Sequence, residues 1–252
     1  MENQIICGNC IEIMRDIPDE SIDLIIADPP YMVSQEGKKI NRAKTISKSW
    51  NRKSSIDFDF GEWDLFPDEE TYKAFTENWF RECTRILKPK AWIYIFFDKN
   101  KTGYFDLDFA PKYNIKPRTI FIWIKSNPTP SFRKVNWLSA TEHIWVGSKG
   151  KSKIKNFLQQ KEMVNYLITP NKTVYGKTSH PTEKPEELIE KFMITSSNRG
   201  DLVLDPFLGS GTTAVVAKKL DRNFIGIEID ENFCAMARQR LSVIPEKLFY
   251  WP

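Results

Sequence analysis

The residues best suited to chemistry lie in the stretch 23–31, which reads Asp-Leu-Ile-Ile-Ala-Asp-Pro-Pro-Tyr. Its apolar run 24–27 is bounded by turn residues, which is typical of a buried parallel strand. Asp28 ends the run, and Pro29 and Pro30 stop further strand pairing because proline has no backbone N–H to donate. Asp28 is therefore predicted at the carboxyl end of a central strand, where open α/β sheets bind their ligands.

This arrangement places a carboxylate, rigid backbone carbonyls and the aromatic ring of Tyr31 within four residues. Such groups can hold a planar ring that carries an exocyclic amino group, since carboxylate and carbonyl oxygens accept hydrogen bonds from an amine. The alternative is an ordinary strand-ending turn, which Asp-Pro-Pro also suits.

A second motif combines a predicted strand at 201–205, the turn Pro-Phe-Leu-Gly-Ser-Gly-Thr-Thr and a predicted helix at 212–220. Gly209 and Gly211 would let the backbone approach a ligand closely at a helix N-terminus. The turn is not the G-x-G-x-x-G of nicotinamide enzymes, because Ala214 occupies the third glycine position, and it is not a Walker A loop.

Glu228 ends the next predicted strand, 223–227, some 17 residues beyond Gly211. A carboxylate in this place can accept hydrogen bonds from both hydroxyls of a ribose, and Ile229 could pack on the attached adenine. A dinucleotide-dependent oxidoreductase is the alternative, but it leaves the 28–31 motif without a task.

The two motifs need a sheet to position them, and the chain has 252 residues with 41% hydrophobic content. This suits one large α/β domain or a domain with an insert. A right-handed β-α-β unit is expected from residue 4 to residue 27, and an antiparallel excursion at the sheet edge is expected later in the chain. The predicted strands are 4–7, 91–97, 118–125 and 143–147, and the predicted helices are 10–15, 68–87 and 185–195.

The cysteines and the hydropathy bear on metal binding, on the redox state of the thiols and on the cellular compartment. Cys7 and Cys10 form a lone C-x-x-C, while Cys83 and Cys234 stand apart, so no zinc site is predicted and reduced thiols are expected. The residues 1–6 show no signal peptide, and no run approaches the length of a membrane span. A soluble, intracellular protein is expected.

The net charge of +4 is unevenly distributed. Residues 35–55 hold seven Lys or Arg against one Glu, and residues 148–180 hold seven Lys against one Glu. Such segregation is expected for binding to a phosphate backbone, although solubilising loops are the alternative. The first segment belongs to a long polar loop, 33–60, which we expect to be mobile without a partner.

Three stretches, 28–31, 180–185 (His-Pro-Thr-Glu-Lys-Pro) and 205–213, resemble in this order the amino-methyltransferases of DNA. These enzymes transfer a methyl group from S-adenosylmethionine to N6 of adenine or N4 of cytosine. Because Asp-Pro-Pro-Tyr precedes Phe-x-Gly-x-Gly, the chain is similar to the circularly permuted β group, from about residue 5 to residue 241.

The resemblance implies a Rossmann-like class I methyltransferase fold of the α/β class, with a mostly parallel seven-stranded sheet flanked by helices. It implies one catalytic domain over 1–252, with 148–180 as an inserted target-recognition region. Glu228 would bind the ribose, and Lys184 would pair with the methionine carboxylate. Many relatives carry Gly-Asp where this chain has Gly8-Asn9, but an Asn carbonyl can still accept from the adenine amino group. The cofactor-binding residues implied are Asn9, Cys10, Asp28, His180, Lys184, Asp205, Phe207, Gly209, Ser210, Gly211, Thr212, Thr213, Glu228 and Ile229.

The catalytic residues implied are Asp28, Pro29, Pro30 and Tyr31. Asp28 and the Pro29 carbonyl would accept hydrogen bonds from the target amine, and Tyr31 would stack on a base flipped out of the duplex. Within the family, Asp rather than Ser as the first motif residue favours adenine; cytosine-N4 methylation stays the nearest alternative, and a non-catalytic DNA-binding module is a further one.

The partner implied is double-stranded DNA, with no metal. A homodimer, a cognate restriction endonuclease and a cytoplasmic location in a microbe or virus are compatible with the resemblance. The residues expected to bind DNA are Lys38, Lys39, Arg42, Lys151, Lys153 and Lys155.

Overall fold

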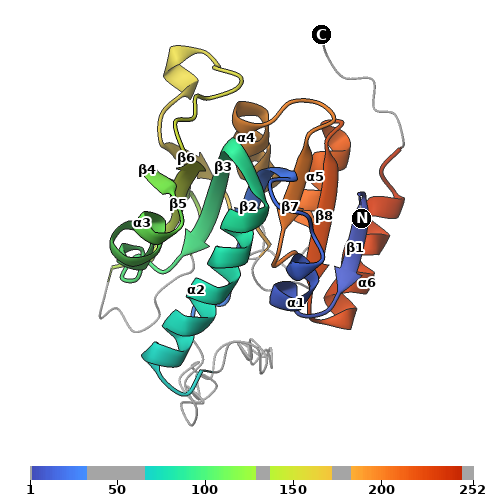
Figure 1. Ribbon diagram of the computed structural model, residues 1–252. Coiled ribbons are helices and arrows are strands. Elements are labelled where there is room, and N and C mark those ends of the chain that lie inside the picture. Colours follow the sequence, from blue (N-terminus) through green and yellow to red (C-terminus); the bar gives the residue numbers. More distant parts are fainter. Residues whose placement is uncertain (1, 33–65, 129–136, 172–182, 246–252) are drawn as a thin grey trace, which may run out of the picture.

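A computed structural model describes residues 2–32, 66–128, 137–171 and 183–245. Their centre is one sheet with the strand order β1-β8-β7-β2-β3-β5-β4-β6 (Figure 1). The strands are β1 (Gln4–Cys7), β2 (Ile22–Ala27), β3 (Leu87–Phe97), β4 (Ile115–Lys125), β5 (Thr141–Lys149), β6 (Tyr166–Thr169), β7 (Leu202–Asp205) and β8 (Asn223–Glu228).

The mostly parallel sheet is confirmed, with one strand more than the seven expected. Only β5 runs against its neighbours among the described strands, because it pairs antiparallel with both β3 and β4. The predicted antiparallel excursion is thus the β4–β5 pair. The additional strand, β6, lies within the segment 148–180 and extends the sheet by pairing parallel with β4.

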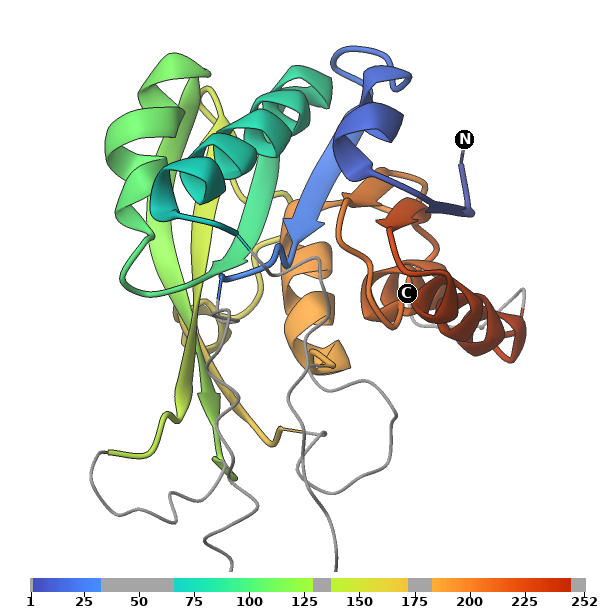
Figure 2. The ribbon, with the colours of Figure 1, turned by 90° about the horizontal axis from the view of Figure 1, so that it is seen from below.

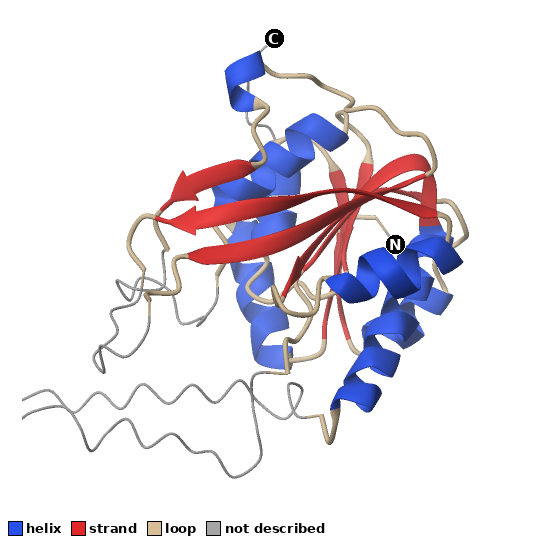
Figure 3. Ribbon diagram, turned by 90° about the vertical axis from the view of Figure 1, so that its left-hand side faces the viewer, coloured by secondary structure: helices blue, strands red, loops and turns tan. Residues whose placement is uncertain are grey.

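Helices cover both faces of the twisted sheet (Figure 3). Helices α1, α2 and α3 lie on one face, and α4, α5 and α6 lie on the other (Figure 2). The helical segments are α1 (Cys10–Arg15), α2 (Glu69–Ile86), the π-helix η3 (Tyr104–Phe109), α3 (Ala110–Lys112), the 3-10 helix η4 (Gln160–Glu162), α4 (Glu186–Ser196), α5 (Thr212–Lys219) and α6 (Glu231–Ser242).

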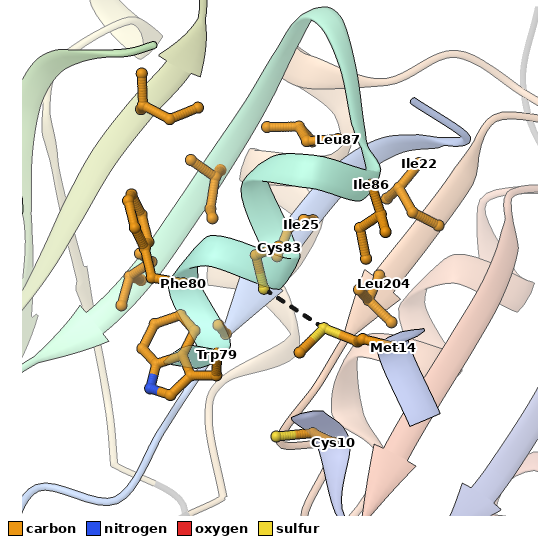
Figure 4. Packing of buried hydrophobic residues seen from close by; sticks show 14 of the residues in the cluster. Cys10, Met14, Ile22, Ile25, Trp79, Phe80, Cys83, Ile86, Leu87 and Leu204 are labelled. Atoms are coloured by element: carbon orange, nitrogen blue, oxygen red, sulfur yellow. Dashed lines mark hydrogen bonds between the residues drawn. The ribbon is translucent and has the colours of Figure 1, made fainter. Parts of the chain in front are cut away.

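Each face has its own apolar core. Under α1 and α2, Met14, Trp79 and Cys83 are fully buried and pack against β2, with the Cys83 and Met14 sulfur atoms 3.8 Å apart (Figure 4). On the opposite face, Phe192 of α4 stacks on Tyr94 of β3 with ring centroids 4.2 Å apart. Because strands β2 and β7 are buried on both faces, their sequences read as continuous apolar runs.

The described helices include none long and apolar enough to cross a membrane. Within the described ranges, no three His, Cys, Asp or Glu side chains lie close enough together to hold a metal ion. All four cysteines are free thiols; Cys7 is exposed, whereas Cys10, Cys83 and Cys234 are buried.

Candidate active site

Asp28 follows the last residue of β2, which lies between β7 and β3 inside the sheet. One carboxylate oxygen of Asp28 lies 2.8 Å from the Lys184 ammonium, and the other accepts a hydrogen bond from the Tyr31 hydroxyl. Burial raises the pKa of Asp28, the Lys184 charge opposes that rise, and the Glu142 charge adds to it. Asp28 is thus a polar group at a strand end whose two oxygens already have donors.

The Asp-Pro-Pro-Tyr turn is supported from α2. The hydroxyl of the fully buried Tyr72 donates to the Pro30 carbonyl at 2.9 Å, and the Lys101 ammonium lies 4.3 Å from the centre of the Tyr72 ring. The Tyr72 hydroxyl therefore satisfies the Pro30 carbonyl. The sequence analysis did not single out Tyr72, so its contact with the motif is a finding of the structure.

Lys184 precedes α4 and is almost fully buried. Its ammonium lies 2.8 Å from Asp28 and 3.3 Å from a carboxylate oxygen of Glu142, and 5.0 Å from the centre of the Phe96 ring. Burial alone would lower the pKa of Lys184, but the two carboxylates outweigh it and raise that pKa above the usual lysine range. In this structure the lysine expected to meet a cofactor carboxylate contacts two carboxylates of the protein.

The second motif begins at Asp205, the last residue of β7 and also buried. One oxygen of Asp205 accepts from the Phe207 backbone N–H at 3.0 Å, and the other accepts from the Thr213 hydroxyl at 2.6 Å. Burial raises the pKa of Asp205 to about 7, although these two hydrogen bonds favour the ionised form. Asp205 therefore shapes the glycine-containing turn by bonding both its start and the helix that follows.

Gly211 has a packing role that the sequence analysis did not predict. Its φ is +89°, and a Cβ placed on it would lie 2.7 Å from the Cβ and 3.0 Å from the Cα of Ala237 in α6. The missing side chain thus makes room for a neighbouring helix, and the expected approach of its backbone to a ligand stays a prediction. Gly209 also has a positive φ, +54°, which a non-glycine residue rarely adopts.

Arg240 of α6 holds the same turn from outside. Its guanidinium donates to the backbone carbonyl and to the hydroxyl of Ser210, each at 2.9 Å, and to one oxygen of Glu183 at 3.1 Å. Thr212 also offers its hydroxyl oxygen to Arg240, at 3.3 Å. Among the described residues, the second oxygen of the buried Glu183 has no hydrogen-bond partner. Arg240 therefore links the turn and α6 to the segment before α4 through hydrogen bonds, and one oxygen of Glu183 stays available as an acceptor.

Glu228, the last residue of β8, accepts from the backbone N–H groups of Gly209 at 2.7 Å and Asp230 at 2.9 Å. Burial raises its pKa. Its own carbonyl accepts from the Gly8 N–H at 2.8 Å, so the ends of β1 and β8 lie together. Ile229 is 56% exposed beside them, which leaves its side chain available to a ligand.

The expected adenine site lies at the end of β1. Cys10 is buried, and Asn9 caps helix α1 by accepting from the Ile11 N–H at 2.9 Å. An amide oxygen has two lone pairs, so this cap leaves one acceptor site on Asn9.

A pocket joins the two motifs. Strands β2 and β7 are parallel neighbours with Ile25 opposite Leu204, so their carboxyl ends, and with them Asp28 and Asp205, lie side by side. The predicted residues that line the pocket are Asp28, Lys184, Asp205, Phe207, Gly209, Ser210, Thr212 and Thr213, joined by Glu183, which the sequence did not single out.

The described residues among those expected to bind DNA, Lys151, Lys153 and Lys155, are not brought to this pocket. Lys155 lies 2.6 Å from Asp201, which precedes β7, and the Lys153 carbonyl accepts from the Trp92 indole of β3 at 3.1 Å. Asp201 directly precedes β7, and Trp92 pairs with Leu24 near the start of β2, so both contacts lie away from the strand ends that carry the pocket. The segment between β5 and β6 protrudes at the top of Figure 1. This placement does not support DNA contacts by these lysines around the pocket. Lys38, Lys39, Arg42 and His180 lie outside the described residues.

The match to a family decides what kind of protein carries this site. Residues 22–239, which contain both motifs and the pocket, match the N6/N4 methyltransferase model described as DNA methylase. The chain belongs to the DNA methylase family. The resemblance inferred from the three sequence motifs is thereby confirmed.

This DNA methylase is 37% identical over 96% of its length to Type II methyltransferase M.HinfI of Haemophilus influenzae, of which the match covers 69%. It is 32% identical over 92% of its length to Type II methyltransferase M2.MboI of Moraxella bovis, with 85% of that protein covered.

Solved structures agree with the fold of this DNA methylase. The M1.HpyAVI–SAM complex has a TM-score of 0.71 at 27% identity and covers 95% of this chain and 99% of that one. The PvuII cytosine-N4-specific DNA methyltransferase has a TM-score of 0.73 at 20% identity and covers 96% and 88%. The expected class I methyltransferase fold is thus confirmed.

Proposed function

We propose that this DNA methylase transfers a methyl group from S-adenosylmethionine to N6 of adenine in duplex DNA. The observation that carries the proposal is that Asp28 and the glycine-containing turn after Asp205 line the same pocket at adjacent strand ends. One half offers acceptors for an amine, and the other offers a turn and helix N-terminus typical of nucleotide-type cofactors.

The residues in and beside the pocket suit the chemical groups of the cofactor. The methionine part of S-adenosylmethionine carries an ammonium group, and Glu183 offers, beside Ser210 and Thr212, a buried carboxylate oxygen that has no partner among the described residues. A buried acceptor without a partner is costly, so a ligand cation that satisfies it binds favourably. Glu228 and the exposed Ile229 fit the ribose and the adenine. When bound, the cofactor supplies an electrophilic methyl group on a positively charged sulfur.

The chain's own residues prepare the target amine. The amino group of adenine is a poor nucleophile because its lone pair is conjugated with the ring. Asp28 and the Pro29 carbonyl would accept its two hydrogens and thereby localise the lone pair on nitrogen, so that positioning and electrostatics supply the catalysis. Asp28 keeps free lone pairs for this role, because a carboxylate has about four acceptor sites.

The assignment to adenine rests on the motif beginning with Asp rather than Ser. Cytosine-N4 methylation is the second candidate, because the same acceptors would hold the amino group of cytosine. An enzyme that methylates a base of duplex DNA must also flip that base out of the helix. We assign stacking on the flipped base to Tyr31. We further place the protein in the cytoplasm. Dimerisation and a cognate restriction endonuclease stay predictions.

The test uses the purified chain, methyl-labelled S-adenosylmethionine and unmethylated bacterial DNA, followed by mass spectrometry of the nucleosides. We expect labelled N6-methyladenine. N4-methylcytosine as the only product would refute the adenine assignment, and no labelled base in DNA would refute the proposed reaction. Asp28→Ala should abolish transfer while calorimetry shows cofactor binding largely retained, because the main role assigned to Asp28 is to accept hydrogen bonds from the amine.

A further inference from the structure

Four side chains of alternating charge form a row that begins at Asp28. The last two, Glu142 and Lys125, belong to none of the sequence motifs. Asp28 lies 2.8 Å from Lys184, Lys184 lies 3.3 Å from Glu142, and Glu142 lies 2.6 Å from Lys125. The four side chains come from different elements: the end of β2, the segment before α4, the start of β5 and the end of β4. The row therefore connects the pocket to the antiparallel β4–β5 pair.

These charges are shielded from water. The exposed fractions of the Lys184, Lys125 and Glu142 side chains are 9%, 16% and 24%. The ammonium groups of Lys184 and Lys125 lie 5.0 and 5.1 Å from the centres of the Phe96 and Trp123 rings. Buried ion pairs are often no more stabilising than apolar packing of the same volume, so stability alone does not account for this row.

We propose that Glu142 is a positioning residue that, through Lys184, holds the carboxylate of Asp28 aimed at the target amine. The inference rests on the proposed function, in which Asp28 accepts from that amine. Glu142 and Lys125 fix the far side of the Lys184 ammonium, so that its remaining donors point to Asp28. Without Glu142, Lys184 would be held by Asp28 alone and could turn into the pocket.

The charges around Asp28 give this role a measurable signature. Lys184, Glu142, Tyr31 and the neighbouring Asp205 face it. The Lys184 charge lowers the pKa of Asp28, and the Glu142 charge raises it. Glu142→Gln should therefore shift the pKa of Asp28 down, and Lys184→Met should shift it up. A side chain that only supports the fold would move neither.

The experiment compares the full-length wild type with Glu142→Gln, Glu142→Asp and Lys184→Met in steady-state methylation of DNA across pH. Glu142→Gln should lower kcat about 10- to 100-fold, as expected when a reacting group is misplaced, and leave the KM for S-adenosylmethionine unchanged. Its acid limb should move to lower pH, whereas that of Lys184→Met should move to higher pH. Glu142→Asp, which keeps the charge on a shorter side chain, should recover part of kcat. The matched control is Glu190→Gln, which changes an exposed glutamate of α4 and should have no effect.

Two results would overturn the inference: an unchanged kcat and acid limb in Glu142→Gln, or a loss of kcat explained by a lower unfolding midpoint alone. A raised KM for S-adenosylmethionine in Lys184→Met, with no shift of its acid limb, would instead assign Lys184 to the cofactor and also refute it. If the wild type transfers no methyl group, the proposed function fails separately. Carbon NMR titration of the Asp28 carboxyl in wild type and Glu142→Gln then still decides the inference.

Discussion

Gly211→Ala should destabilise the protein through one identifiable contact. The added Cβ would stand 2.7 Å from the Cβ of Ala237, a distance at which something must shift, and 3.0 Å from its Cα, which is backbone. The left-handed backbone costs a non-glycine residue about 1–2 kcal/mol, and overpacking adds about 1–3 kcal/mol. We expect the free energy of unfolding to fall by about 2–5 kcal/mol in total.

Gly200 provides the matched control. Its φ of +80° is close to the +89° of Gly211, but a Cβ there meets nothing within 4 Å. Gly200→Ala should therefore lose only the backbone contribution of about 1–2 kcal/mol. Urea unfolding followed by circular dichroism measures both variants, and the slope of free energy against urea should stay that of the wild type.

The neighbouring alanine gives a second check. Ala237→Gly alone should cost up to about 1 kcal/mol because it places glycine in a helix interior. In the Gly211→Ala background it removes the 2.7 Å contact and should restore part of the lost stability. The reasoning would be refuted if Gly211→Ala cost no more than Gly200→Ala. A loss of cofactor binding at unchanged stability would return Gly211 to the ligand-facing role expected from the sequence.

Changes at three further positions test the candidate site. Glu228→Ala should weaken cofactor binding in calorimetry, because the ribose acceptor and the bond to the turn are both lost; unchanged affinity would refute that assignment. Tyr31→Phe should keep most activity at high pH but move the acid limb of kcat upward, since its hydroxyl lowers the pKa of Asp28, whereas Tyr31→Ala should also lose about 1–3 kcal/mol of stacking. Asp205→Asn should remove a pH dependence of stability. Burial raises the pKa of Asp205 to about 7, so its contribution is complete below about pH 4 and is lost as pH rises through about 7. Between pH 5 and pH 8 the wild type should lose more unfolding free energy than the variant, and equal losses would contradict the raised pKa.

Local patterns predicted the elements whose burial is regular. The apolar run before Asp28 is buried in β2, and Tyr72 and Trp79 in the predicted helix 68–87 are fully buried in α2, so the signal in the sequence was strong. No helix was predicted over 231–242, where α6 buries only Cys234 and Ala237. Two small side chains make a weak apolar stripe. Strand β6 was not predicted for a similar reason: Tyr166 and Ile168 are 44% and 59% exposed, so its apolar pattern is weak.

The sequence predicted those residues of the candidate site in which a carboxylate directly follows the apolar run of a strand. Asp28, Asp205 and Glu228 each follow an apolar run, and all three lie at the carboxyl edge of the sheet. Glu142 and Arg240 carry no such signal. Arg240 meets Glu183 across 57 residues, and Glu142 meets Lys184 only because β5 returns antiparallel beside β3. Such partners are set by tertiary packing, which a single sequence does not encode locally.

The same geometry is compatible with the permuted order of the motifs. The pocket needs Asp28 and Asp205 at adjacent strand ends, and the parallel pairing of β2 with β7 supplies this whichever strand comes first in the chain. The two strands are almost 180 residues apart in sequence, so their pairing is maintained by burial on both faces rather than by a short connection. Lys184 and Glu183, which precede α4, line the same pocket as both motifs. The segment before α4, rather than either motif, is therefore the part of the chain whose placement makes two half-sites into one.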